Sequence, residues 1–259
     1  MSKLSTDEKF IDFSDYGRPF AVTAANYLKK TPATPVQVTL LFGVCGLMAV
    51  YSILLGYYTT AGILLVLKSI IDAVDGELAR AKKTPSYTGR YLDSVFDIIL
   101  NILIIGAIWY VTESALWAAL LAFIGLQLQG TLYNYYYVIL RHQSKNGDKT
   151  SNIFEYETPT AYPREKQKTV NRLFTTYKFF YSLFDKAIYM IDRNAPDTKP
   201  FPKWFMSLLS LYGLGFQLLI IAVMLALGFI QYIIPFFIIY SFFILLFVMT
   251  RKVFLNEIA

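Results

Sequence analysis

Four aspartates stand close together in a strongly apolar chain, in which only 16% of the residues are charged. Asp72 and Asp75 are three residues apart, and Asp93 and Asp97 are four apart. At these spacings, the members of each pair lie on one face of a helix. Unpaired carboxylates repel one another and are costly to desolvate near a bilayer. A divalent cation with oxygen ligands removes that cost, and Mg²⁺ keeps open positions for substrate phosphates. The spacing therefore predicts a metal site that binds a phosphate compound.

Small residues and one arginine accompany these aspartates. Gly76 and Ala79 continue the face of the first pair, and Gly89 stands in the turn before the second pair. Without bulky side chains, a ligand can approach the helix backbone closely. Arg80 supplies a fixed cation for a diphosphate. Together these features indicate a nucleotide diphosphate as the ligand.

The combined pattern resembles the signature of the CDP-alcohol phosphotransferase family at every fixed position. In this chain it reads Asp72-x2-Asp75-Gly76-x2-Ala79-Arg80-x8-Gly89-x3-Asp93-x3-Asp97. The resemblance implies transfer of a substituted phosphate from a CDP-linked donor to an alcohol, with release of CMP. It also implies a homodimer and a cofactor of Mg²⁺ or Mn²⁺, as two ions.

The resemblance also implies roles for the matching residues. The metal ligands would be Asp72, Asp75, Asp93 and Asp97, and Asp97 would also be the catalytic base. The cytidine diphosphate would lie against Gly76, Ala79, Arg80 and Gly89. The physical chemistry agrees, because divalent ions offset charge on a leaving phosphate and a carboxylate can accept the proton of a hydroxyl group.

Long uncharged runs identify the chain as an integral membrane protein. Hydrophobic residues make up 56% of its 259 residues and charged residues 16%, whereas soluble domains carry about 25% charged residues. An apolar run of roughly 20 residues spans a bilayer as a helix. We therefore predict an all-α polytopic membrane protein. Its six transmembrane helices are expected near residues 36–56, 60–80, 91–112, 115–140, 204–227 and 230–250.

Two other helices are expected to lie along the membrane surface. One follows the break at Gly17-Arg18-Pro19, and its aromatic face is typical of an amphipathic interfacial helix. The other is the charged, amphipathic segment 169–192. The chain then divides into four parts. These are an N-terminal interfacial segment (1–35), a catalytic four-helix part (36–140), a cytosolic loop with the amphipathic helix (141–203), and the last two spans (204–259).

Basic residues set the expected orientation. They are concentrated before the first span, in the second-to-third and fourth-to-fifth loops, and at the C-terminus. The positive-inside rule then places both termini and the active site in the cytoplasm, with the protein in the cell (inner) membrane. The net charge of +6 is dispersed over these flanks. It suits an anionic lipid surface and argues against a nucleic-acid partner.

Other classes of membrane protein fit the pattern less well. Intramembrane prenyltransferases also use aspartates and Mg²⁺ on diphosphates, but they lack the Asp-Gly-x2-Ala-Arg element. A divalent-cation transporter would not need the glycines and the Ala-Arg pair. A histidine-based catalytic triad would have to use His142, the only histidine, and no serine-nucleophile motif accompanies it. Cys45 is the only cysteine, which excludes a disulfide within the chain.

The sequence leaves open the identity of the CDP-linked donor and of the acceptor alcohol. One branch of the family joins CDP-diacylglycerol to a small polar alcohol, and the other joins CDP-choline or CDP-ethanolamine to diacylglycerol. Eukaryotic members of the second branch are larger and carry a histidine where this chain has Ser94, so we favour CDP-diacylglycerol. Lys68, one turn before Asp72, is either a salt-bridge partner or a cation at the acceptor pocket. Asn134, in a polar stripe of the fourth span, is a second acceptor candidate.

Overall fold

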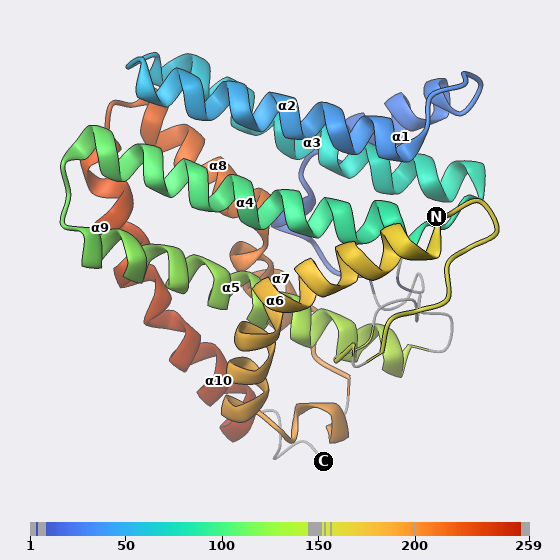
Figure 1. Ribbon diagram of the computed structural model, residues 1–259. Coiled ribbons are helices and arrows are strands. Elements are labelled where there is room, and N and C mark those ends of the chain that lie inside the picture. The colour runs from blue at the N-terminus through green and yellow to red at the C-terminus, as the bar shows by residue number, and fades with distance from the viewer. Residues whose placement is uncertain are drawn as a thin grey trace.

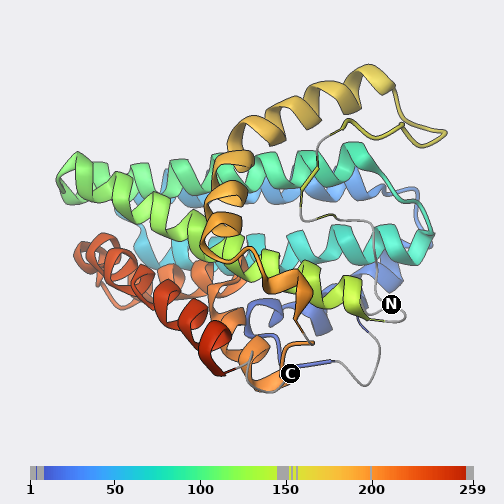
Figure 2. The same cartoon turned by 90° about the horizontal axis from the view of Figure 1, so that it is seen from below.

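Four long helices form the centre of the molecule (Figures 1 and 2). The computed structural model describes residue 4 and residues 9–144, 152, 154–155, 157–198 and 200–254. Across these residues the structure is helical and contains no strand, which confirms the all-α prediction. The long helices are α2 (Pro35–Leu54), α3 (Tyr58–Lys82), α4 (Tyr87–Thr112) and α5 (Leu116–Gln143). Helix α2 packs on both α3 and α4, and α4 packs on α5.

The helices in the second half of the chain pack on α3, α4 and α5 and leave α2 at the outer edge of the molecule (Figure 1). Its helices are α6 (Gln167–Ile191), α7 (Lys203–Leu209), α8 (Leu214–Ala226), α9 (Ile230–Ser241) and α10 (Phe243–Phe254). Helix α8 packs on α3, and α9 packs on α5. Helix α8 approaches α3 closely at Gly62. A Cβ added at this glycine would lie only 2.7 Å from the carbonyl oxygen of Ala222. Such small-residue contacts are common between membrane helices.

Several helices are long and apolar enough to cross a membrane. Four stretches meet this condition by length and composition, namely Pro35–Leu54, Tyr87–Thr112, Leu116–Gln143 and Ile230–Val253. The pair Lys203–Tyr212 and Leu214–Ala226, bent by 52°, makes a fifth if it is one broken span. Helix α3 is absent from this set, because its apolar part contains Lys68, Asp72 and Asp75. The structure thus fits an integral membrane protein, and the count of six spans stays a prediction that requires both α3 and the bent pair to cross the membrane.

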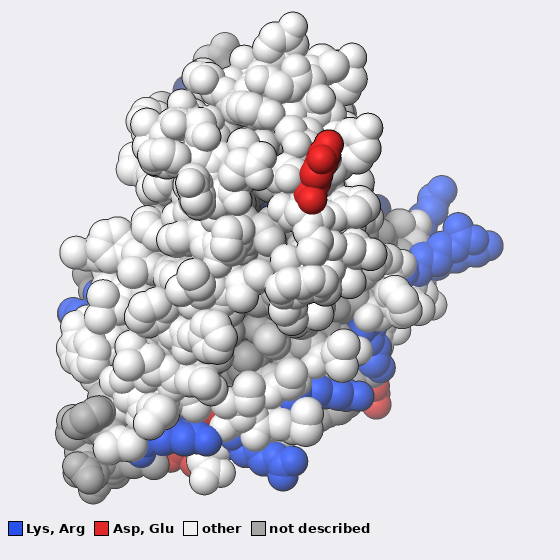
Figure 3. Space-filling model, turned by 90° about the vertical axis from the view of Figure 1, so that its left-hand side faces the viewer, with Lys and Arg blue, Asp and Glu red and all other residues white. Residues whose placement is uncertain are grey.

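The outer surface agrees with contact to lipid. Figure 3 looks onto the side of the molecule where the turns between α2 and α3 and between α4 and α5 lie (Figure 1), and this face is almost free of charged side chains, with lysines and arginines near its lower and lateral edges. Helix α2 exposes a series of large apolar side chains, namely Leu40, Leu41, Val44, Leu47 and Met48. Large exposed apolar areas of this kind mark membrane or protein contact sites.

The two expected surface helices are present as helices. Helix α1 (Arg18–Leu28) has Pro19 in its first turn and packs on α3 with Ala21 and Ala25 buried. Its Phe20 and Tyr27 are exposed. Helix α6 bends partway along its length (Figures 1 and 2) and packs on α4 and α5. The location of both helices at a membrane interface stays a prediction.

Candidate active site

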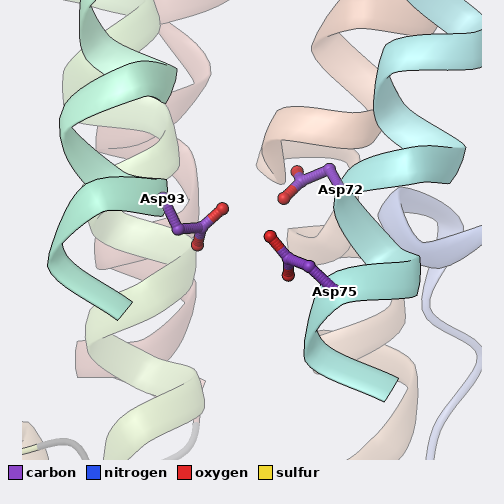
Figure 4. Close-up of side chains that lie close together, drawn as sticks. All are labelled: Asp72, Asp75 and Asp93. Carbon is purple, nitrogen blue, oxygen red and sulfur yellow. The ribbon is translucent and has the colours of Figure 1, made fainter. Parts of the chain in front are cut away.

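A short turn places the end of α3 beside the start of α4. Lys83 ends α3 in a left-handed conformation with φ 54°. The Ser86 hydroxyl then caps α4 by accepting a hydrogen bond from the Gly89 N–H at 2.8 Å. The Glu165 carboxylate adds to this cap, accepting from the Ser86 hydroxyl and from the Thr88 N–H, each at 2.7 Å. The turn thus sets the two motif helices antiparallel, with their aspartates facing each other (Figure 4), and both helices pack on α2.

The electrostatics of Glu165 suit this position. Burial acts to raise the pKa of its carboxyl group, but hydrogen bonds from Ser86, Thr88 and Tyr162 outweigh burial and hold the pKa below its usual value. A negative charge at a helix N-terminus is also favoured by the helix dipole. Glu165 lies far from the motif in sequence, and no local pattern identified it.

Three of the four motif aspartates converge. Figure 4 shows Asp72 and Asp75 on α3 pointing toward Asp93 on α4. One carboxylate oxygen from each residue lies within 4.8 Å of the others. Asp75 also accepts a hydrogen bond from the Thr39 hydroxyl of α2, at 2.7 Å. The buried Oδ1 of Asp93 has no hydrogen-bond partner among the described residues.

These observations fit a divalent cation. Buried polar atoms in proteins are almost always hydrogen-bonded, and an orphan atom calls for an explanation such as an ion. The donor set is made of carboxylate oxygens, which are the ligands that Mg²⁺ and other hard cations prefer. Asp72, Asp75 and Asp93 are therefore the residues that could hold a metal ion.

Asp97 has a different environment. It lies one turn further along α4 and forms an ion pair with Lys68. The Lys68 ammonium also lies 3.5 Å from Asp72 and 4.6 Å from the centre of the Phe42 ring. Lys68 is 1% exposed. Lys68 lies behind the aspartates and contacts Asp72 and Asp97. It does not line the cavity described next.

A cavity of about 430 Å³ opens over the aspartates. Of the sequence-predicted residues, its wall contains Asp72, Asp75, Gly76, Arg80, Asp93, Asp97 and Asn134. A Cβ at Gly76 would lie 3.5 Å from the Arg80 guanidinium, which is ordinary van der Waals contact, so the packing of the protein itself does not require a glycine there. Ala79 and Gly89 are not on this wall. Their contact with a nucleotide stays a prediction, as do the acceptor roles of Lys68 and Asn134.

Residues outside the motif complete the cavity. The N-terminal segment contributes Asp12, Asp15 and Arg18, and α6 contributes Tyr177, Tyr181 and Asp185. The N-terminal segment is held by the Tyr133 hydroxyl, which donates to Asp12 at 2.5 Å. These residues have no fixed spacing relative to the motif, so the sequence pattern missed them. The only sequence feature that pointed to any of them was the amphipathic character of segment 169–192, which contains Tyr177, Tyr181 and Asp185.

Comparison with known proteins identifies the family. A sequence profile described as CDP-alcohol phosphatidyltransferase matches residues 33–191, more than half of the chain. The chain therefore belongs to the CDP-alcohol phosphatidyltransferase family, which confirms the resemblance found in the motif.

Curated relatives match shorter regions. A "Bifunctional IPC transferase and DIPP synthase" of Thermococcus kodakarensis is 35% identical over 106 residues, which cover 40% of this chain and 24% of that protein. The protein of the same name from Aquifex aeolicus is 38% identical over 77 residues, covering 29% of this chain and 17% of the relative. An "Archaetidylinositol phosphate synthase" of Pyrococcus horikoshii is 41% identical over 64 residues, covering 25% and 34%. The matched part of the chain thus spans 34% or less of each relative.

Proposed function

We propose that this protein is a membrane-embedded phosphotransferase of phospholipid biosynthesis. It moves the phosphatidyl group of CDP-diacylglycerol to the hydroxyl of a small alcohol and releases CMP. The observation that carries the proposal is the convergence of Asp72, Asp75 and the unpartnered Asp93 oxygen on a cavity that Arg80 also lines. Membership of the family and the names of its relatives support the same kind of transfer.

In this proposal the motif residues bind the donor through a divalent metal. Asp72, Asp75 and Asp93 hold Mg²⁺ or Mn²⁺, and Asp97 contributes to a second ion. When bound, the ions supply charge neutralisation for the diphosphate and for the leaving CMP. Arg80 holds the diphosphate, and the absent side chain at Gly76 leaves room for it beside the helix.

Asp97 is the proposed general base. As the oxygen of the acceptor attacks phosphorus, a new P–O bond forms and the P–O bond to CMP breaks, while the hydroxyl proton passes to Asp97. A base must lie within hydrogen-bond reach of that proton. Asp97 lies on the cavity wall one turn from Asp93. The Lys68 ion pair supports it by fixing the orientation of the carboxylate.

The proposed location is the cell membrane, with the cavity and both termini on the cytoplasmic side, and the active form is a homodimer. Segment 141–203 is the cytosolic loop with the amphipathic helix in this arrangement. The grouping of basic residues on one set of loops supports the orientation, and the apolar helices support the membrane location.

The test is product analysis on purified full-length protein. CDP-diacylglycerol with a panel of small alcohols should release CMP and form a phospholipid. CMP release from CDP-choline or CDP-ethanolamine with diacylglycerol would instead assign the other branch of the family. Pyrophosphate from a polyprenyl diphosphate would indicate a prenyltransferase, and Mg²⁺ flux without CMP would indicate a transporter; either result overturns the proposal.

A further inference from the structure

The cavity over the aspartates continues into a polar recess toward the middle of α4. Asn101 follows Asp97 by four residues, so the two side chains lie on one face of that helix. Gln127 of α5 and Gln217 of α8 line the same cavity as Asn101. All three amides are buried: Asn101 and Gln127 are 6% exposed, and Gln217 is 1% exposed. Uncharged hydrogen-bonding groups therefore take the place of carboxylates in this part of the cavity, which we call the amide recess.

Gln217 is held by one end of its amide and open at the other. Its Nε2 donates to the carbonyl oxygen of Leu126 and to Oε1 of Gln129, each at 3.0 Å. Gln129 in turn donates through Nε2 to the Ser241 hydroxyl at 2.9 Å, and that hydroxyl donates to the carbonyl oxygen of Phe237 at 2.7 Å. This chain of donors fixes which atom of the Gln217 amide is the oxygen. The remaining Oε1 is buried and accepts no hydrogen bond from the described residues.

Gln127 has the opposite requirement. Its Nε2 is buried and donates to no residue that the structure describes. A buried polar group without a partner is costly, and polar side chains in membrane helices generally serve a ligand or another buried group. Gln217 therefore needs a donor and Gln127 an acceptor. A hydroxyl group is both, whereas the ester oxygens of the lipid donor only accept hydrogen bonds and a metal ion would satisfy Gln217 alone.

From this arrangement we infer that the acceptor is a polyol and that a second hydroxyl of the acceptor lies in the amide recess, donating to Gln217 and accepting from Gln127. The inference rests on the proposed function and goes further by naming the acceptor class and two residues that recognise it. The reacting hydroxyl lies at Asp97. Asn101 is one helical turn away, about 5–6 Å between Cβ atoms, a distance that one small polyol spans. The three amides are uncharged, so the recess accepts a polyol with or without a phosphate group elsewhere.

The first experiment removes hydroxyl groups from the acceptor while keeping the one that reacts. CMP release is measured with saturating CDP-diacylglycerol and Mg²⁺ for four pairs. They are glycerol against 1-propanol, glycerol 3-phosphate against 3-hydroxypropyl phosphate, myo-inositol against cyclohexanol, and inositol 1-phosphate against 3-hydroxycyclohexyl phosphate. L-Serine, with a single hydroxyl, completes the panel. In the active pair we expect kcat/KM to favour the polyol by about tenfold or more, because the other member leaves both glutamines unpaired.

Variants of the two glutamines test the recess itself. Gln127→Met keeps the length of the side chain and removes no hydrogen bond between described residues, so it should fold. It should reduce the preference for the polyol by about tenfold through the KM of the acceptor, with the KM of CDP-diacylglycerol unchanged. Gln217→Met should act in the same direction. It should also lower thermal stability, because Leu126 and Gln129 lose a donor.

Gln143→Met is the matched control. Gln143 lies on the same helix as Gln127 and also has a buried, unpartnered amide atom, but it does not line the cavity. Its substitution should leave the preference unchanged. If Gln217→Met does not fold, as judged by thermal unfolding and CDP binding, Gln127→Met decides. An unchanged preference in folded Gln127→Met overturns the inference and assigns the recess to buried water.

The wild-type protein separates this inference from the proposed function. Equal use of both members of every active pair, or CMP release with L-serine alone, overturns the inference and leaves the proposed function intact. No CMP from any acceptor overturns both.

Discussion

Two groups of buried charged residues in this protein have opposite compositions. Where α6 ends beside α10, Asp192 pairs with Arg251, with Oδ2 of the carboxylate 2.6 Å from Nε of the guanidinium. The Tyr136 hydroxyl donates to the same oxygen at 2.6 Å, and both ends of the ion pair are 1% exposed. Where α3 faces α4, one lysine pairs with two of the four aspartates, Asp72 and Asp97, and an oxygen of Asp93 has no hydrogen-bond partner among the described residues.

The difference separates a structural ion pair from a ligand site. In the first group, both carboxylate oxygens of Asp192 lie against the Arg251 guanidinium and Oδ2 also accepts from Tyr136, so among the described residues the protein itself balances this charge. In the second group, the negative charges exceed the positive charge contributed by the protein. Such an excess is stable only when something else supplies cations. The comparison predicts that cations and ligands change the behaviour of the second group and leave the first unaffected.

The largest expected effect is the loss of activity when divalent cations are removed. Chelation with EDTA should abolish CMP release, and added Mg²⁺ or Mn²⁺ should restore it. Asp72→Asn or Asp75→Asn should weaken metal and nucleotide binding together, since both side chains point into the aspartate group. Titration calorimetry with CDP, with and without Mg²⁺, measures both effects. Full activity in EDTA would contradict the metal mechanism.

A smaller effect is expected at Asp97. If it is the base, Asp97→Asn should slow turnover by about 10²–10⁴-fold while CDP and metal still bind measurably. The reason is that Asp97 lies outside the group of three converging carboxylates and pairs with Lys68. The same calorimetric titration serves as the control. Should Asp97→Asn abolish CDP binding as completely as Asp72→Asn does, Asp97 is chiefly a metal ligand.

The balanced group should respond through stability alone. Arg251→Met leaves Asp192 buried without its cation, and removing one partner of a buried ion pair costs about 3–5 kcal/mol. The variant should unfold at lower temperature in detergent and should keep its metal dependence. The double variant Asp192→Asn, Arg251→Met removes both charges and should recover much of the lost stability. A double variant as unstable as Arg251→Met would show that packing of the arginine side chain, not charge balance, stabilises this group.

How much the sequence could predict differs between the two groups for a physical reason. The motif aspartates lie on two adjacent helices joined by a short turn, so helical spacing was sufficient to bring them together. Asp192 and Arg251 are 59 residues apart, and no periodic pattern relates them. The same limit applies to Asp185, which reaches the cavity only because α6 packs on α4 and α5. Helix positions follow from local hydrophobicity, whereas contacts between distant helices depend on packing that no local pattern encodes.

The Glu165 carboxylate shows a third way of balancing a charge, and its substitution is expected to have the smallest effect on the protein. Its negative charge is balanced by hydrogen-bond donors at the start of α4, without any cation among the described residues. Caps of this kind contribute about 0.5–2 kcal/mol, and the partial exposure of Glu165 places the expected value near the lower end, since solvent screens its charge. Glu165→Gln should therefore lower thermal stability slightly at pH 7, and Glu157→Gln, at an exposed position, is the matched control.

The pH dependence of this effect follows from the lowered pKa of Glu165. A carboxyl group with a lower pKa in the folded state stabilises the protein above its unfolded pKa, which is about 4.3 for glutamate. This contribution is lost as the pH falls through the folded pKa. The difference in melting temperature between wild type and Glu165→Gln should accordingly be present at pH 7 and shrink below about pH 4. A difference that persists unchanged in acid would mean that the carboxylate charge is not what stabilises the start of α4, and that a neutral hydrogen-bonding side chain is sufficient there.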